Sequence, residues 1–371
     1  MSKICVYAIC KNELKFIDKW LENMSEADYI VILDTGSTDG TYEKLQEDPR
    51  VTLVKQQEIK PWRFDVARNE SMKLIPDDAD ILVCTDFDEL FEPGWAQFLR
   101  ENWVPEYHNR CHYTYVWNHS DEGRPLVTFT YDKIHTRDLH WRFAVHEVLW
   151  PQNLEEYEEN ALDLKERIVL HHWQDLSKSR KNYLDLLKLA CEEEPNCSHI
   201  WGLYGREYVL LREYEEAIEV LLKTLDCSDI EFADGQKTLL QTLYLLAWSY
   251  YNLQNYEECY WYCQEFLRVN SSYREPYLLL SRAYIEQKLP ILAEATMKAM
   301  FEYTTYKKDW VENADSWTWA PYAVLGATYL NLNKWKKAQE NLKEALVYEP
   351  DNVQLLKQYI FCLENQLNKI A

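Results

Sequence analysis

Acidic side chains follow two short apolar runs near the amino terminus. Asp34 comes directly after the run at residues 29–33 and opens the segment DTGSTDGT, residues 34–41, while Asp86 and Asp88 follow the run at residues 81–85. The carboxyl ends of strands in an open α/β sheet face the crevice in which such sheets bind ligands. We therefore expect Asp34 to offer a carboxylate to a nucleoside. A capped turn without a ligand is the alternative, since Gly, Ser, Thr and Asp are favoured there.

The second acidic segment, DFDE at residues 86–89, has the spacing of a divalent-cation site. On a strand, Asp86 and Asp88 would point to one face while Phe87 turns toward the core. Two carboxylates about 4 Å apart repel by roughly 1 to 4 kcal/mol, and a cation removes that cost. Oxygen ligands suit Mg²⁺ or Mn²⁺, which also bridge diphosphate oxygens. A solvated acidic turn is the alternative.

A third polar segment, WRFDVARN at residues 62–69, lies between the first two. A helix that begins at Phe64 would place Asp65 and Arg68 on one face. Arg68 would then approach a phosphate, and Asp65 would approach either a base edge or Arg68 itself. A surface ion pair is the alternative.

The elements that must position these residues alternate along the first half of the chain. Apolar runs at residues 4–9, 29–33, 51–54 and 81–85 alternate with amphipathic stretches at 13–24 and 64–75 and a shorter helix that begins near Thr41. This βαβ alternation is typical of an open sheet covered by helices. Further strand-like runs at 112–117, 126–131 and 167–170 indicate a mixed second part.

From about residue 180 the pattern changes to one helix after another, with four units that repeat matching positions. Each helix pair of such a repeat cannot bury its apolar face alone, so the units stack into a curved solenoid whose concave side commonly holds an extended peptide. The unit that best fits the 34-residue tetratricopeptide repeat (TPR) pattern contains Tyr322, Leu325, Gly326, Tyr329, Trp335, Ala338, Leu342, Ala345 and Pro350.

Charge and cysteine usage exclude several classes of protein. The 371 residues include 62 acidic and 40 basic side chains, a net charge of −22. Such a chain repels a phosphate backbone, so we expect no nucleic-acid partner, and a cationic peptide is favoured. No CxxC pair, signal-peptide pattern or basic amphipathic segment is present. We therefore expect a cytoplasmic protein without a membrane partner.

The three polar segments, in this order and spacing, resemble the family 2 nucleotide-sugar glycosyltransferases of the GT-A fold over about residues 3–175. Fusion to TPRs resembles a bacterial subgroup that includes glycosyltransferases modifying peptides such as the bacteriocin sublancin. The resemblance implies an α/β GT-A domain with a Rossmann-like mixed sheet at residues 1–178. An all-α TPR solenoid at residues 179–371 would follow it.

The resemblance also implies roles for the acidic residues. Asp34 and Asp65 would hold the uridine of a UDP-sugar, and Arg68 would support the nucleotide pocket or the diphosphate. Asp86 and Asp88 would form the DxD site for Mn²⁺ or Mg²⁺, with Asp86 also on the donor side.

Two later segments resemble further parts of that family. WRFAVHE, residues 141–147, is similar to the subgroup's acceptor-side motif, which makes Glu147 our candidate general base and His146 its neighbour or competitor. Inversion requires the acceptor hydroxyl to lose its proton during attack. A buried His–Glu contact is the alternative. IVLHHW, residues 168–173, lies where a late metal-ligating histidine is expected. Adjacent strand residues face opposite ways, so one of the two ligates, and we expect His171 rather than His172.

The sequence therefore predicts a metal-dependent, inverting transferase that moves a hexose or N-acetylhexosamine from a UDP-sugar to a protein or peptide. The repeats would hold that acceptor or mediate a homodimer. Two alternatives stay open. One is a transferase acting on a glycan or lipid-linked acceptor, and the other is a non-catalytic repeat scaffold with a degenerate nucleotide-binding domain.

Overall fold

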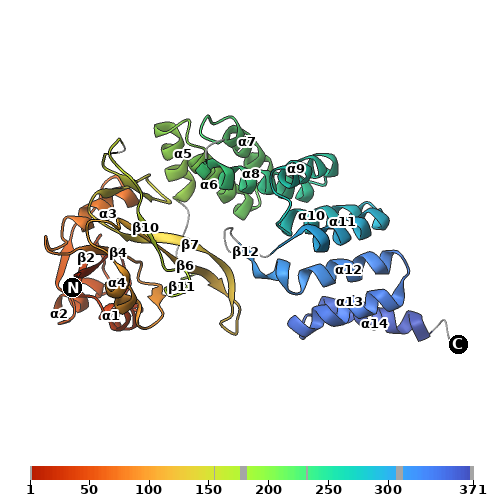
Figure 1. Ribbon diagram of the computed structural model, residues 1–371, viewed down its shortest axis with the longest axis horizontal. Helices are drawn as coiled ribbons and strands as arrows, with labels where there is room; N and C mark the ends of the chain where they lie inside the picture. Colours follow the sequence, from red (N-terminus) through yellow and green to blue (C-terminus); the bar gives the residue numbers. More distant parts are fainter. Residues whose placement is uncertain (1, 154, 176–181, 231–232, 306–311, 368–371) are drawn as a thin grey trace. The chain divides into compact units, whose positions relative to one another are not determined.

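The computed structural model describes residues 2–153, 155–175, 182–230, 233–305 and 312–367 (Figure 1). The chain divides into two compact units, Met1–Ala190 and Cys191–Ala371, which are described separately. The predicted boundary between residues 178 and 179 lies outside the described residues.

Parallel strands form the first half of the sheet in the N-terminal unit. The strands β1 (Ile4–Cys10), β2 (Tyr29–Asp34), β3 (Leu53–Gln56) and β4 (Ile81–Cys84) lie in the order β3-β2-β1-β4. Helices α1 (Ile17–Met24), α2 (Thr41–Glu47) and α3 (Phe64–Met72) connect them. In the register, Cys10 lies beside Asp34 and Asp34 beside Gln56, so the carboxyl ends share one edge. The predicted βαβ alternation is confirmed.

The second half of the sheet is mixed, as predicted. The order continues from β4 through β7 (Pro125–His135), β6 (Arg110–His119) and β11 (Val169–His172) to β5 (Glu89–Phe91). Strands β7 and β5 run antiparallel to their neighbours, β11 runs parallel to β6, and β10 (Ala161–Asp163) also pairs with β6. Helix α4 (Trp95–Asn102) follows β5, and β8 (Leu139–Arg142) and β9 (Val148–Pro151) form a separate two-stranded ribbon.

Both faces of β1, β2 and β4 are buried, which explains why these strands are continuous apolar runs. In β1, Ile4, Val6 and Ala8 belong to one core cluster, while Cys5 and Tyr7 belong to another. Side chains alternate between the two faces of a strand, so helices must cover both. Helix α1 contributes its apolar side, Ile17, Trp20, Leu21 and Met24, to the first cluster.

The second unit consists of helices that pair in succession, α6 with α7, α8 with α9, α10 with α11 and α12 with α13, followed by α14 (Figure 1). Helix α5 (Tyr183–Glu193) precedes them. The four predicted helix pairs are present, which confirms the all-α second part of the fold. The bounds are α6 (Ser198–Leu211), α7 (Tyr214–Leu225), α8 (Ala233–Asn252), α9 (Tyr256–Val269), α10 (Glu275–Glu286), α11 (Pro290–Tyr303), β12 (Glu312–Asn313), a 3₁₀ turn η1 (Ala314–Trp317), α12 (Ala320–Asn331), α13 (Trp335–Tyr348) and α14 (Val353–Leu367).

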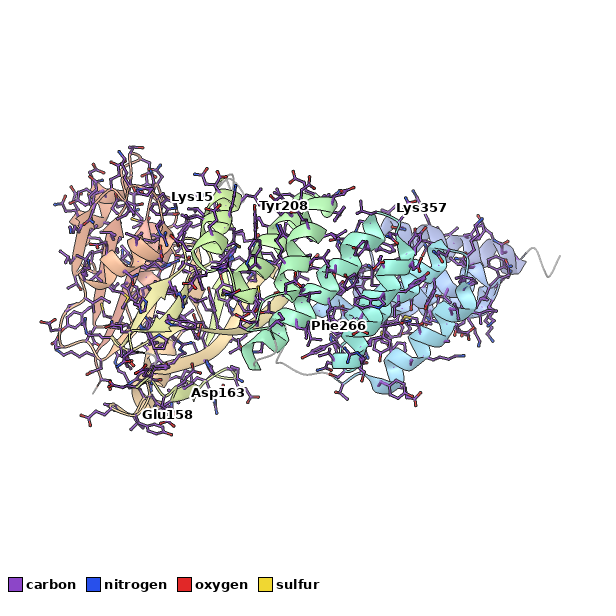
Figure 2. The ribbon with its side chains drawn as sticks, turned by 90° about the horizontal axis from the view of Figure 1, so that it is seen from above. Lys15, Glu158, Asp163, Tyr208, Phe266 and Lys357 are labelled. Carbon is purple, nitrogen blue, oxygen red and sulfur yellow. The ribbon has the colours of Figure 1, made fainter. Side chains whose placement is uncertain are left out.

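Small residues and aromatic side chains fix how these helices pack. A Cβ atom on Gly205 would lie 2.5 Å from the Leu221 side chain, and one on Gly326 would lie 2.7 Å from the Leu342 side chain. The two glycines therefore let α6 approach α7, and α12 approach α13, more closely than any other residue would allow. Phe266 on α9, labelled in Figure 2, belongs to the same apolar cluster as Leu221. Within the described residues, no helix is both long enough and apolar enough to span a bilayer.

Candidate functional site

Asp34, the last residue of β2, organises the turn that follows it. The side chain is buried, and its Oδ1 accepts hydrogen bonds from the Gly36 and Ser37 amides at 2.9 Å and from the Gln56 side chain at 3.0 Å. Gly36 has a φ of +108°, which suits glycine. Burial alone would raise the pKa of Asp34, but these hydrogen bonds outweigh it and hold the pKa below its usual value. Asp34 is therefore an ionised carboxylate that fixes the turn at the sheet edge.

The DFDE segment forms a turn between β4 and β5. The Glu89 amide donates to the Asp86 carbonyl at 3.0 Å, and the Asp86 amide donates to the Glu89 carboxylate at 2.9 Å. Phe87 is buried and stacks on Trp20 with ring centroids 4.3 Å apart, so the prediction that Phe87 turns toward the core is confirmed. The two aspartates lie in a turn and not on a strand, because β4 already ends at Cys84.

Arg68 on α3 joins two of the predicted segments. Its guanidinium donates to both oxygens of Asp86 at 2.9 and 3.1 Å, and its Nε donates to Oε1 of Glu147. Only 4% of the Arg68 side chain and 9% of the Glu147 side chain are exposed. Burial opposes the charge on Arg68, but Asp86 and Glu147 raise its pKa well above the usual value. The DxD turn and the candidate general base therefore share one buried cation.

Asp65 lies one turn of α3 before Arg68 and pairs with a different residue. Its carboxylate accepts two hydrogen bonds from Arg63, at 3.0 and 2.9 Å. Both residues lie on α3, as expected, but the ion pair of Asp65 is with Arg63, directly before the helix, and not with Arg68.

Lys133 and Glu89 are members of this cluster to which sequence reasoning assigned no role. Lys133 Nζ lies 3.4 Å from both Asp86 Oδ2 and Glu89 Oε1, and Tyr115 donates to Glu89 at 2.9 Å. Burial disfavours the ammonium group, but Asp86 and Glu89 raise the pKa of Lys133 well above its ordinary value. The one available signal was that Lys133 is two residues from Tyr131 on a strand, which places both on the same buried face.

The adjacent histidines of β11 face different partners, as expected for neighbours on a strand. His172 Nε2 lies 3.6 Å from Asp88 Oδ2, whereas the ring nitrogens of His171 lie 2.9 Å from His119 and 3.3 Å from Glu92. We expected His171 as the metal ligand, and the structure places His172 beside the DxD turn instead.

The side chains near Asp88 supply some of the ligands that a divalent cation needs. Across the described ranges, no group of three or more His, Cys, Asp and Glu side chains is arranged to hold a metal. Asp88 and His172 together offer one carboxylate and one imidazole, while the Asp86 oxygens accept from Arg68. Mg²⁺ typically keeps several waters and is held by one or two carboxylates plus substrate phosphates, so two protein ligands are compatible with such an ion.

The candidate acceptor side lies in the loop between β8 and β9. Phe143 and His146 have φ values of +79° and +51°, a conformation that non-glycine residues adopt rarely. The Phe64 amide donates to the Ala144 carbonyl at 2.9 Å, and the His146 ring meets Tyr183 edge-on at 5.7 Å. The hydrogen bond from Phe64 therefore holds the loop against the start of α3, where Glu147 forms its ion pair with Arg68.

Residues 5–143 match the model of the family described as Glycosyl transferase family 2. This match supports a glycosyltransferase. The matched range contains Asp34, Asp65, Arg68, Asp86 and Asp88, and it ends before His146, Glu147 and the histidines of β11. No curated protein matches the chain.

Solved structures of TPR proteins are similar to about half of the chain. A thermophilic TPR protein of Thermus thermophilus has 19% identity and a TM-score of 0.37, covering 49% of this chain and 90% of its own. A TPR protein of Parabacteroides merdae has 13% identity and a TM-score of 0.39, with 49% and 65% covered. YrrB, described as a TPR protein with an unusual peptide-binding site, has 20% identity and a TM-score of 0.37, with 48% and 81% covered. Because these TM-scores are below 0.5, the repeat architecture rests on the chain's own helix pairs.

Proposed function

We propose that this glycosyltransferase moves a hexose or N-acetylhexosamine from a UDP-sugar to a side chain of a protein or peptide, with inversion at the anomeric carbon. One observation carries the proposal. Arg68 holds the Asp86 carboxylate of the DxD turn and the Glu147 carboxylate of the β8–β9 loop on one guanidinium, inside a unit that matches a glycosyltransferase family.

The donor side of the proposed reaction lies at the carboxyl ends of β2 and β4. Asp34 holds the turn at residues 35–37, and Asp65 is a carboxylate that can accept from uracil or ribose donors. Arg68 and Lys133 place two positive charges next to Asp86, which favours an anionic diphosphate nearby. Asp88 and His172 would hold Mg²⁺ or Mn²⁺, an ion that stabilises charge on a departing diphosphate.

The acceptor side is the Glu147 carboxylate, with His146 as its neighbour. In the proposed step the acceptor atom forms a bond to the anomeric carbon as its proton passes to Glu147, and the bond from that carbon to the diphosphate oxygen breaks. UDP leaves with the electron pair. A positioned base typically contributes about 10²- to 10⁴-fold to such a step. In this proposal the helix pairs of the second unit hold the polypeptide acceptor, and the net charge of −22 favours a cationic one.

The first test measures release of UDP from a panel of UDP-sugars, with and without a chelator. Asp88→Asn should lower metal-dependent release by at least about 10²-fold, because it removes the carboxylate expected to hold the ion. Asp78→Asn, at a surface carboxylate paired with Lys3, is the matched control and should be neutral. Full activity of the Asp88 variant would rule out the proposed metal site.

The second test separates the base from the donor site. Glu147→Gln should bind UDP as the native chain does, measured by calorimetry, and should lose transfer to candidate polypeptides by about 10²- to 10⁴-fold, measured by intact mass. Modification of glycans or lipid-linked sugars in place of polypeptides would favour the alternative acceptor class. Absence of UDP binding under all conditions would favour the scaffold alternative.

A further inference from the structure

The last described helix, α14, carries an apolar stripe on its exposed side. Its residues Val353, Leu356, Ile360, Leu363 and Leu367 follow one another at intervals of 3, 4, 3 and 4 residues. The exposed fractions are 63% for Val353, 37% for Leu356, 51% for Ile360 and 66% for Leu367, and Leu363 is half-buried. The opposite side of the helix buries Leu355 and Cys362 in the cluster shared with α13.

The spacing of this stripe is that of a helix–helix interface. Apolar residues that recur at intervals of three and four residues form the heptad pattern by which one helix packs against another. The exposed stripe therefore has the pattern of a surface that a second helix covers.

We propose that the stripe binds the same stripe of a second copy of the chain, with the two α14 helices antiparallel. In an antiparallel heptad pair, Ile360 of one copy faces Leu363 of the other, and Leu356 faces Leu367. That register also places Lys357 of each copy opposite Glu364 of the other, so the twofold axis produces two complementary charge pairs. Both side chains are exposed and flank the stripe. In a parallel pair Glu364 would face the uncharged Tyr359 instead. The positions of Lys357 and Glu364 therefore favour a second copy of the chain as the partner, with its α14 helix antiparallel.

The contact area is small, since α14 spans only 15 residues. A contact of this size suits a reversible dimer whose population depends on concentration. The inference is independent of the proposed transferase activity.

Sedimentation velocity of the full chain between about 1 and 100 μM tests the proposal. The native chain should shift from monomer to dimer across this range. Ile360→Glu should abolish the dimer, because it places a charge in the centre of the interface. Ile291→Glu, the same change at a 73% exposed position on α11, should leave it unchanged. A native chain that stays monomeric, or a dimer indifferent to Ile360→Glu, would overturn the proposal.

Charge reversal tests the direction without disturbing the apolar packing. Lys357, labelled in Figure 2, and Glu364 are both at the surface. Lys357→Glu and Glu364→Lys should each weaken the dimer about tenfold, since each turns two attractive pairs into repulsive ones. The double reversal should restore native affinity. Additive losses in the double variant would refute the antiparallel register.

A carbodiimide cross-link provides a direct readout. Lys357 and Glu364 of one helix are about 10.5 Å apart along its axis, too far for a zero-length bond within the chain. A Lys357–Glu364 cross-link found by mass spectrometry in the dimer fraction would support the proposal. A dimer whose cross-links involve neither residue would contradict it.

Discussion

Replacing Arg68 with Met should destabilise the N-terminal unit more than any ordinary surface change. Arg68 is 4% exposed and pairs with the Asp86 and Glu147 carboxylates. Removing one partner of a buried ion pair typically costs about 3 to 5 kcal/mol, because the other charge is left uncompensated in the interior. Asp86 keeps Lys133 at 3.4 Å, so most of the cost should come from Glu147.

Glu147→Gln separates these contributions. The amide oxygen can still accept from Arg68 Nε, and Arg68 keeps Asp86, so this variant should cost about 1 to 2 kcal/mol. In the double variant no unpaired Glu147 carboxylate remains. We therefore expect its destabilisation to be smaller than the sum of the single changes by at least about 1 kcal/mol.

The assay is urea unfolding followed by hydrogen exchange, read by mass spectrometry on peptides from α3 and β8, so that the N-terminal unit is measured separately from the helices. Arg100→Met is the matched control. Arg100 pairs with Asp28 at 2.9 Å, the Asp28 side chain is 39% exposed, and the loss of this pair should cost at most about 1 kcal/mol. An Arg68 variant that is no less stable than the Arg100 variant, or an additive double variant, would refute the reasoning.

Two further predictions concern stability elsewhere. Burial lowers the pKa of His135 to about 3, so between that value and about 6.5 the unfolded state binds the extra proton and stability rises with pH, by up to about 1.4 kcal/mol per unit. His135→Gln should flatten that slope in urea titrations at several pH values, and an unchanged slope would show that other groups cause it. Gly205→Ala should cost about 1 to 3 kcal/mol in thermal unfolding, because the added Cβ would meet Leu221 at 2.5 Å. Gly202→Ala, whose Cβ would lie 3.2 Å from Thr238, should cost less, and equal costs would contradict the packing argument.

Much of the fold could be predicted because its determinants are local. The strands β1, β2 and β4 are buried on both faces, so they appear as uninterrupted apolar runs. The repeats carry small residues where paired helices approach each other, and this leaves a recurring pattern. Asp34 ends β2 and Asp86 lies two residues beyond the end of β4, so the topology of parallel strands places both at the carboxyl edge of the sheet.

The parts that could not be predicted depend on contacts between distant segments. Lys133 lies on a strand that looks half-polar, and only the pairing of β7 with β4 brings it to Asp86. The choice between His171 and His172 depends on which face of β11 is directed at the DxD turn, and a shift of one residue reverses it. The β8–β9 ribbon was not predicted, and it pairs only with itself, apart from the main sheet.

The stack of Phe87 on Trp20 has a consequence for how the acidic turn behaves. Phe87 lies between Asp86 and Asp88 in the chain and is buried against Trp20 of α1. A large movement of either carboxylate would therefore require the Phe87 ring to lose its contact with Trp20. The turn should thus be stiff before any ligand arrives, and little reorganisation would accompany binding. Replacing Trp20 with a smaller residue would therefore make Asp86 and Asp88 more mobile, although α1 contributes no charged side chain to the Arg68 cluster.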